Sequence, residues 1–302
     1  MVDLKLQIPD SFYEEEIRCG FTVTKKRKEL WAVQLDLISE FDRVCKAHGL
    51  KYYADGGTAL GAVRHNGFIP WDDDVDIAMF RAEYNKLCEI ASEEFRYPYF
   101  FQTEHTDRGS MRGHAQLRNS ETTAILMTEL DIKLPINQGV FIDIFPLDNV
   151  PEDENERSVF ITSLQKKRKL ARVYARLSSR YRKCPVSLKE MAIRACHSVL
   201  GNSENPFYNS FEKHAQSYSE PTEKVALLCL PETPESLVWE KAWYRETVMM
   251  PFEMLQIPVC ADYAAYLTKH YGDWKTPVQG INYHGRLLID TEKPYTEYTG
   301  HK

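Results

Sequence analysis

Residues 74–80 alternate acidic and apolar side chains with a period of two, and this segment limits the possible folds more than any other part of the chain. A strand with one buried face fits this pattern, because successive side chains point to opposite faces of a sheet. Val75 and Ile77 would then face a core, while the carboxylates of Asp74 and Asp76 project together from the other face. We therefore predict a strand that presents an acidic pair to a divalent cation.

A pair of glycines precedes this strand, and the pattern predicts a short helix directly after them. Gly56 and Gly57 allow the backbone to approach a phosphate group closely. A helix that begins near Thr58 would direct its unpaired N–H groups and the positive end of its dipole at the same anion. Arg64 and His65, near the end of this helix, would add charge or hydrogen bonds. We expect this segment to bind the phosphates of a substrate.

Asp143 is the candidate for a third carboxylate, since it interrupts an otherwise apolar strand predicted over residues 139–145. A carboxylate among apolar side chains costs free energy unless it is paired or binds a metal. Asp72 shares the parity of Asp74 and Asp76 and would join them if their strand begins early enough. An acidic run alone is typical of a solvated loop. The conjunction with the glycine turn and the later aspartate favours a site for Mg²⁺ or Mn²⁺.

Helical and strand-like patterns are interleaved along the chain, which predicts an α/β or α+β fold. Residues 29–48 and 263–271 have helical spacing and are each followed by a glycine. Pro146 is expected to end the strand that contains Asp143, so Asp148 is interpreted as a turn or cap residue. The other predicted elements are a strand at residues 51–54, a helix at residues 81–95, and strands within residues 97–101 and 113–126.

The character of the chain changes after residue 150, where it becomes helical and strongly basic. Basic side chains are concentrated in residues 166–172 and continue at Arg176, Arg180, Arg182 and Lys183. We therefore divide the chain into a catalytic core, residues 1–150, and a helical lobe with the C-terminal part, residues 151–302, which would complete the substrate site. A basic helix is most typical of a solvated surface, but it is also a candidate contact with an anionic acceptor or the inner face of a membrane.

The composition excludes several classes of function. A net charge of −6 argues against duplex nucleic acid as a partner, because that binding needs many basic contacts with phosphates. The seven cysteines form no CxxC pair, which disfavours a disulfide framework and a zinc site. Residues 1–20 contain no continuous apolar stretch, so we expect a cytoplasmic location. The histidines share no ligand spacing and receive no role (His105, His114, His197, His214 and His270).

Two motifs resemble the LicD family, which includes phosphocholine transferases and is related to the fukutin proteins. The motifs are DGGTALGAVRHNGFIPWDDDVD at residues 55–76 and FIDIFPLD at residues 141–148, with YGDW at residues 271–274 as a weaker third match. The resemblance covers roughly residues 25–295. It implies a nucleotidyltransferase-like mixed sheet flanked by helices, with Asp74 and Asp76 as metal ligands and Asp143 as the later acidic position. It also implies that the glycine turn and Thr58 bind the donor phosphates.

The resemblance further implies a reaction: phosphocholine passes from CDP-choline to a sugar hydroxyl of a cell-surface glycan, such as a teichoic acid, lipopolysaccharide or capsule precursor, and CMP leaves. In that reaction Asp143, or Asp72 as the alternative, would accept the proton of the hydroxyl. A choline head group needs aromatic rings around its charge. The candidates are Trp71, Tyr271, Trp274 and Tyr283, although aromatic residues more often serve packing.

Three alternatives stay open at the level of sequence. The donor would be a different CDP-alcohol, such as CDP-ribitol or CDP-glycerol, if the pocket presents polar groups in place of aromatic ones. The same acidic site would also support transfer of a nucleoside monophosphate. A non-catalytic scaffold is disfavoured, because buried carboxylates without a metal are costly.

Overall fold

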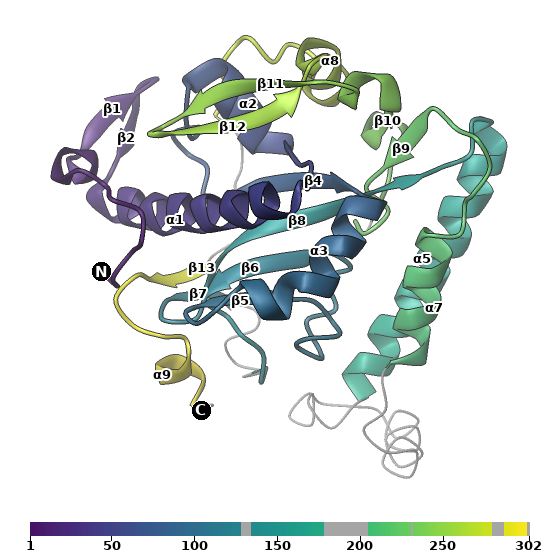
Figure 1. Ribbon diagram of the computed structural model, residues 1–302, viewed down its shortest axis with the longest axis horizontal. Coiled ribbons are helices and arrows are strands. Elements are labelled where there is room, and N and C mark those ends of the chain that lie inside the picture. Colours follow the sequence, from purple (N-terminus) through teal and green to yellow (C-terminus); the bar gives the residue numbers. More distant parts are fainter. Residues whose placement is uncertain (128–133, 178–204, 231, 280–286, 301–302) are drawn as a thin grey trace.

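The computed structural model describes residues 1–127, 134–177, 205–230, 232–279 and 287–300 (Figure 1). The predictions made for Arg180, Arg182, Lys183, His197 and Tyr283 lie outside these residues. No helix in the described part of the chain is long and apolar enough to cross a membrane.

A mixed sheet of seven strands forms the centre of the molecule, as the interleaved sequence patterns predicted. The long strand β8 (Val140–Asn149) runs through its middle and pairs in parallel with β4 (Asp76–Phe80). β8 also pairs antiparallel with β6 (Ala115–Asn119) and, near its end, with β9 (Lys224–Ala226). The sheet is completed by β3 (Tyr53–Ala54) beside β4, β5 (Tyr99–Gln102) beside β6, and β10 (Val238–Glu240) beside β9.

Helices α1 (Lys25–His48) and α3 (Arg81–Glu94) lie over the front face of this sheet in Figure 1. The predicted end of α1 at His48 is confirmed, although the helix begins four residues earlier than the predicted Glu29. Gly49 adopts the left-handed conformation, with φ of 62°, that favours glycine after a helix. Thr24 caps the other end by accepting a hydrogen bond from the backbone N–H of Arg27. The indole of Trp31 stacks on Phe68 at 4.6 Å between ring centroids, which ties α1 to the segment before β4.

A second layer covers the end of the sheet near β4. It contains α2 (Gly56–His65), the hairpin of β11 (Thr247–Phe252) and β12 (Leu255–Cys260), and α8 (Tyr263–Tyr271) (Figure 1). The remaining short elements are η1 (Asp10–Tyr13), β1 (Glu16–Arg18), β2 (Phe21–Val23), β7 (Thr123–Leu126), η3 (Glu235–Leu237), η4 (Lys241–Tyr244), β13 (Leu287–Asp290) and α9 (Thr296–Thr299).

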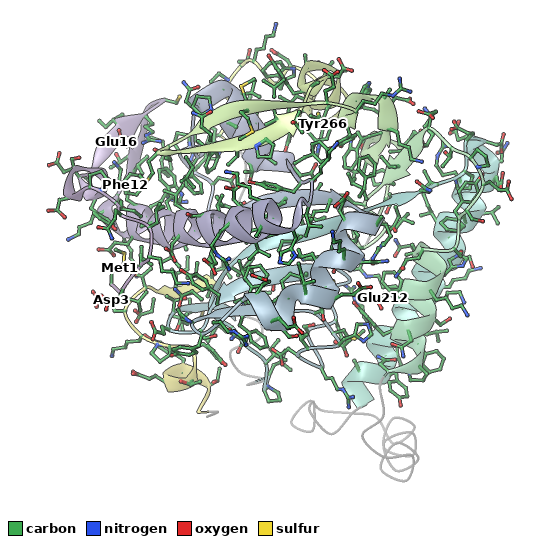
Figure 2. All side chains as sticks on the ribbon, viewed as in Figure 1. Met1, Asp3, Phe12, Glu16, Glu212 and Tyr266 are labelled. Carbon is green, nitrogen blue, oxygen red and sulfur yellow. The ribbon has the colours of Figure 1, made fainter. Side chains whose placement is uncertain are left out.

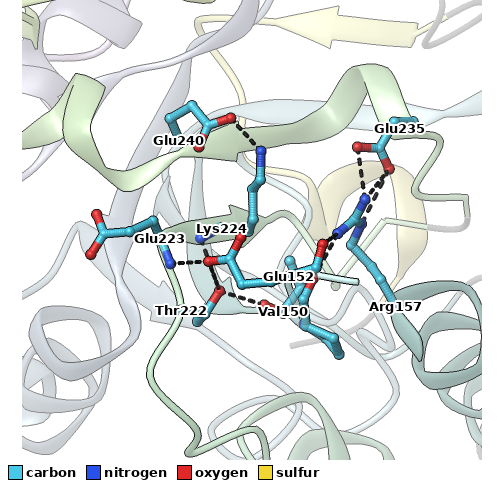
Figure 3. Close-up of polar contacts among 9 residues, drawn as sticks. Val150, Glu152, Arg157, Thr222, Glu223, Lys224, Glu235 and Glu240 are labelled. Carbon is cyan, nitrogen blue, oxygen red and sulfur yellow. Dashed lines mark hydrogen bonds and ion pairs between the residues drawn. The ribbon is translucent and has the colours of Figure 1, made fainter. Parts of the chain in front are cut away.

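Within the described residues, the predicted helical region after residue 150 contains α5 (Glu154–Leu177) and α7 (Pro206–Ala215), which pack side by side (Figure 1). Their contact forms a separate small core that includes Leu164 and Phe211. Arg157 fixes the start of α5, because its guanidinium bonds to Glu235 and to two backbone carbonyls (Figure 3). The division of the chain at residue 150 stays a prediction.

One strand boundary was predicted wrongly. β8 continues through Pro146 and carries Asp148 inside the sheet, where its side chain is buried. The backbone N–H of Asp143 donates to the carbonyl oxygen of Val75, the residue before β4, so the nitrogen of residue 146 faces the opposite side by alternation. On that opposite side of β8, pairing with β6 ends at Ile144 and pairing with β9 begins at Asp148. The proline therefore lies in a gap between the two partner strands, where no backbone hydrogen bond of the sheet needs its missing N–H.

The start of α2 also differs from the prediction. Gly56 and Gly57 belong to the first turn of the helix, and Asp55 stands at its N-cap, so no separate glycine turn precedes it. β4 begins at Asp76, and Asp74 lies in the extended segment before the strand.

Candidate functional site

Carboxylates from three segments line one cavity of about 590 Å³. Asp76 is the first residue of β4 and stands beside Asp143 in the parallel register of β8. Asp74 precedes β4 by two residues, and Asp55 comes from the N-cap of α2. The structure therefore brings together the three aspartates predicted as metal ligands and adds Asp55, whereas Asp72 is not among the described residues that line the cavity.

The acidic cluster is held in place by α2 and α8. The backbone N–H of Asp76 donates to the Thr58 hydroxyl at 2.8 Å. Tyr266, which α8 contributes in the upper layer of the molecule (Figure 2), donates its hydroxyl proton to Asp55 at 2.6 Å and accepts the N–H of Gly56 at 2.8 Å. A Cβ atom at position 56 would lie 2.9 Å from Oδ2 of Asp76, and the φ of 48° also favours glycine there. Glycine at position 56 therefore makes room for the Asp76 carboxylate.

Asp143 is positioned by side chains of β6 and of the residue just before it. His114 Nε2 and Gln116 Nε2 both donate to Oδ1 of Asp143, at 2.9 and 2.6 Å. Buried Arg118 in turn donates to the side-chain oxygen Oε1 of Gln116, which fixes the orientation of that side-chain amide. No hydrogen bond from the described residues reaches Oδ2, so this atom is left to a ligand in the cavity.

Burial and mutual repulsion set the protonation of the cluster. Burial, with the charges of Asp74 and Asp143 beside it, raises the pKa of Asp76 well above its usual value. Burial also raises the pKa of Asp55 and of Asp74 to about 6. The pKa of Asp72 rises to about 9 through burial and its proximity to Asp74, so the neutral Asp72 carboxyl shares its proton with Asp74 near pH 7.

Asp143 behaves differently from the other carboxylates. Burial favours its neutral form, but His114, Arg112 and Gln116 together lower its pKa below the ordinary range. Burial lowers the pKa of His114, so a neutral imidazole donates Nε2–H to an ionised Asp143. The cavity thus contains one carboxylate that is firmly ionised beside others that resist ionisation.

The donor set fits a hard divalent cation. Mg²⁺ and Mn²⁺ prefer carboxylate oxygens, and a cation would relieve the repulsion that raises the pKa values of Asp74 and Asp76. Asp74, Asp76 and Asp143 are the residues that would hold it in the cavity. A second group of carboxylates that could hold a metal ion lies nearby: Asp72, Asp73 and Asp74 each have one oxygen within 4.8 Å of the others.

The other residues predicted to bind substrate are not among the described side chains that line the cavity. Gly57 gives space to the Asp72 carboxylate, since a Cβ there would lie 2.6 Å from its Oδ2. Arg64 donates to the carbonyl of Trp274 at 2.7 Å and to His65, and Trp71 packs edge-on against Phe21. The contact of Gly57, Thr58, Arg64, His65 and Trp71 with a donor stays a prediction. Of the aromatic candidates, Tyr271 lines the cavity, while the indole of Trp274 donates to Thr268.

Sequence reasoning missed several lining residues, namely Asp55, Arg112, His114, Gln116 and His270. A signal for one of them was present. Gln116 stands between the apolar residues Ala115 and Leu117 of β6, whereas Arg112 and His114 lie in the segment before that strand. Their position next to Asp143 follows only from the pairing of β6 with β8. Asp55 and His270 carry no periodic signal of this kind.

Clustered carboxylates on neighbouring strands, beside a glycine-rich helix start, are an arrangement suited to holding phosphates for transfer. The fold and the site thus define a phosphotransferase with a nucleotidyltransferase-like fold. Residues 49–171 match the family model described as LicD/FKTN/FKRP, nucleotidyltransferase domain. This segment of the chain therefore matches a nucleotidyltransferase domain of the LicD type.

Individual relatives agree with this assignment. The chain is 25% identical over 255 residues to the lipopolysaccharide cholinephosphotransferase LicD of Haemophilus influenzae, covering 82% of this chain and 90% of the relative. It is 49% identical over 51 residues to the human and mouse ribitol 5-phosphate transferase FKRP, covering 17% of this chain and 10% of those proteins. An uncharacterised protein of Rickettsia prowazekii is 39% identical over 54 residues, covering 18% of this chain and 20% of the relative. The predicted family and the phosphotransferase class are confirmed.

Proposed function

We propose that this chain transfers phosphocholine from CDP-choline to a sugar hydroxyl of a cell-surface glycan and releases CMP, with Mg²⁺ or Mn²⁺ as cofactor. The observation that carries the proposal is the convergence of Asp74, Asp76 and Asp143 at one cavity. The similarity to the Haemophilus cholinephosphotransferase extends along most of both chains, which favours choline as the transferred alcohol.

The residues of the cavity would divide the work of the reaction. A cation bound by Asp74, Asp76 and Asp143 would neutralise the charge of the donor diphosphate. Asp143 is the better candidate to accept the proton, because it is ionised and lines the cavity. The carboxyl of Asp72 is neutral near pH 7 and does not line the cavity. Tyr271 would contact the quaternary ammonium, a contact worth about 0.5 to 2 kcal/mol.

The wall of the cavity is largely apolar, which suits exclusion of water from the reacting phosphorus. Its apolar lining residues come from β7, β8, the loops after β9, and β13, and they include Leu126, Phe141, Phe145, Leu227, Leu230 and Leu287. A dry wall beside the carboxylates would favour transfer to a sugar hydroxyl over hydrolysis. We further propose that the chain works in the cytoplasm, where the exposed face of α5 with Lys166, Lys169 and Arg172 would contact the inner membrane face.

Ribitol phosphate is the second candidate for the transferred group. It is favoured by the 49% identity to FKRP over 51 residues, although that match is short. Glycerol phosphate transfer and nucleotidylyl transfer would use the same acidic site.

The test is a panel of donors. Purified protein is incubated with Mg²⁺ and with CDP-choline, CDP-ribitol or CDP-glycerol, in the presence and absence of lipopolysaccharide or teichoic acid, and CMP release and the modified glycan are measured. We expect CMP release from CDP-choline and phosphocholine on the glycan. Turnover of CDP-ribitol alone would replace choline by ribitol, and a cytidylylated glycan would establish nucleotidylyl transfer. Absence of turnover with every donor would refute the proposed activity.

A further inference from the structure

Two arginines lie together where the segment before β6 meets α5. Arg112 lines the cavity next to His114, three residues before β6. Arg168 lies on the buried stripe of α5, at helical spacing from Leu164 and Ala171, and is only 6% exposed. The guanidinium of Arg168 donates to the backbone oxygen of Arg112 at 3.3 Å, so the two residues are in direct contact.

Other enclosed arginines of the described structure have partners that explain their position. Arg81 forms a two-pronged ion pair with Asp148. Arg118 donates to two side-chain amides and the Gly139 carbonyl, and Arg157 pairs with Glu235. In each case the oxygens of the partner offset the loss of water around the charge.

Arg112 and Arg168 lack this compensation within the described residues. Nη1 of Arg168 and Nε of Arg112 are buried and have no hydrogen-bond partner there, and neither guanidinium forms an ion pair with a carboxylate. Burial and the neighbouring Arg172 lower the pKa of Arg168 to about 10, which is consistent with a missing counter-charge. Removing a cation from water without a partner is costly. An anionic ligand such as a phosphate would supply the missing partner for both arginines.

We infer that Arg112 and Arg168 form a phosphate-binding subsite of the cavity, in which Arg112 contacts the phosphate and Arg168 supports it with a second positive charge. The carboxylates and these arginines then offer one ligand a metal-binding side and a cationic side. Asp143 links the two sides, since the charge of Arg112 helps to lower the pKa of this carboxyl. The phosphate belongs either to the nucleotide of the donor or to the acceptor, and the assignment to this cavity rests on the proposed function.

The test measures binding without turnover. Arg112→Gln and Arg168→Gln are compared with Lys213→Gln, a control that removes an exposed charge from the neighbouring helix α7. Isothermal titration in Mg²⁺ is carried out with CMP as the nucleotide phosphate, with cytidine as its phosphate-free match, and with glycerol 3-phosphate as the probe for an acceptor phosphate. We expect both variants to bind at least one phosphate probe tenfold more weakly or worse, and the control and the cytidine affinity to be unchanged.

The outcomes separate the two sources of phosphate. Weakened CMP binding assigns the subsite to the donor, and weakened glycerol 3-phosphate binding with normal CMP binding assigns it to the acceptor. Unchanged binding of both probes by both variants overturns the inference. Arg168→Lys, which keeps the charge, should retain more binding than Arg168→Gln, and thermal unfolding without ligand shows that each variant is folded.

The inference and the proposed function fail in different ways. If the donor panel shows no turnover but the phosphate probes still distinguish Arg168→Gln from Lys213→Gln, the subsite stands and the proposed reaction falls. If CDP-choline is turned over and the probes bind all variants equally, the reaction stands and the subsite is refuted.

Discussion

At the scale of single residues, the acidic end of the cavity depends on neighbours that lie far from the aspartates in the sequence. Asp143 receives two hydrogen bonds on one oxygen, from His114 and Gln116, and keeps the other oxygen for a ligand. Residues that orient metal ligands are commonly worth one to two orders of magnitude in metal affinity or activity. His114 therefore has a positioning role that its isolated place in the sequence does not reveal.

Replacing His114 by alanine tests this role. The variant loses one of the two donors to Asp143 Oδ1, and we expect the Mg²⁺ concentration for half-maximal CMP release to rise by about 10- to 100-fold. His105→Ala is the matched control, because His105 pairs with Glu212 on α7 away from the cavity. Equal metal requirements in both variants would show that His114 does not position the site.

Gly56 is the second residue whose identity the site requires. In Gly56→Ala the new methyl group would press on Asp76 Oδ2, and the positive φ would add about 1 to 2 kcal/mol of backbone strain. We expect loss of CMP release together with a modest fall in the free energy of unfolding. Gly20→Ala has a similar positive φ but no atom within 4 Å of the added Cβ, so it should lose stability and keep its activity.

At the scale of elements, the sheet and α3 are joined through a buried ion pair. Arg81, the first residue of α3, forms two hydrogen bonds of 2.6 and 2.7 Å with Asp148 of β8. Asp148 is only 1% exposed, so its charge depends on this partner.

Breaking the pair should therefore destabilise the fold. We expect Arg81→Ala to reduce the free energy of unfolding in urea by about 3 to 5 kcal/mol, because it leaves a buried carboxylate unpaired. The double variant Arg81→Met with Asp148→Leu removes both charges and should lose much less. A double variant as unstable as the single one would indicate that packing, and not the unpaired charge, carries the effect.

The elements that sequence alone predicted well are those with local signals. α1 and α8 have helical periodicity and a following glycine, and Asp74, Asp76 and Asp143 were found from strand parity and from an acid in an apolar run. Asp148 was misjudged because a proline usually ends a central strand, and only the gap between β6 and β9 permits it here. Arg112, His114, Asp55 and Tyr266 require knowledge of which strands and helices meet, which no local pattern contains.

At the scale of the whole molecule, the cavity joins three parts of the sequence: residues 55–76, residues 112–145 and residues 227–287. Three of its aspartates, Asp55, Asp74 and Asp76, and the neighbouring Asp72 have folded-state pKa values above their unfolded values. The stability that these four groups contribute is therefore full below about pH 4 and is lost as the pH rises through the folded pKa. Without a metal, the folded protein therefore favours the neutral form of these carboxyls, whereas metal binding requires their ionised form.

This conflict predicts a pH dependence of stability in EDTA. Asp72, with its pKa raised to about 9, should lower the free energy of unfolding by about 2 kcal/mol between pH 7 and pH 9. Asp72→Asn removes this titration, so its stability should vary less over the same interval, as measured by urea unfolding at each pH. Identical slopes for the two proteins would contradict the raised pKa.

The central claim is that the carboxylates of the cavity hold the catalytic metal, and the most direct measurement is CMP release from CDP-choline as a function of Mg²⁺ concentration. The proteins to compare are the unmodified chain, Asp76→Asn, which alters the cavity, and Asp73→Asn, which alters only the neighbouring Asp72–Asp74 group. We predict that Asp76→Asn abolishes metal-dependent release while Asp73→Asn retains it. Full activity of Asp76→Asn, or loss of activity in Asp73→Asn alone, would contradict this account and place the metal outside the cavity.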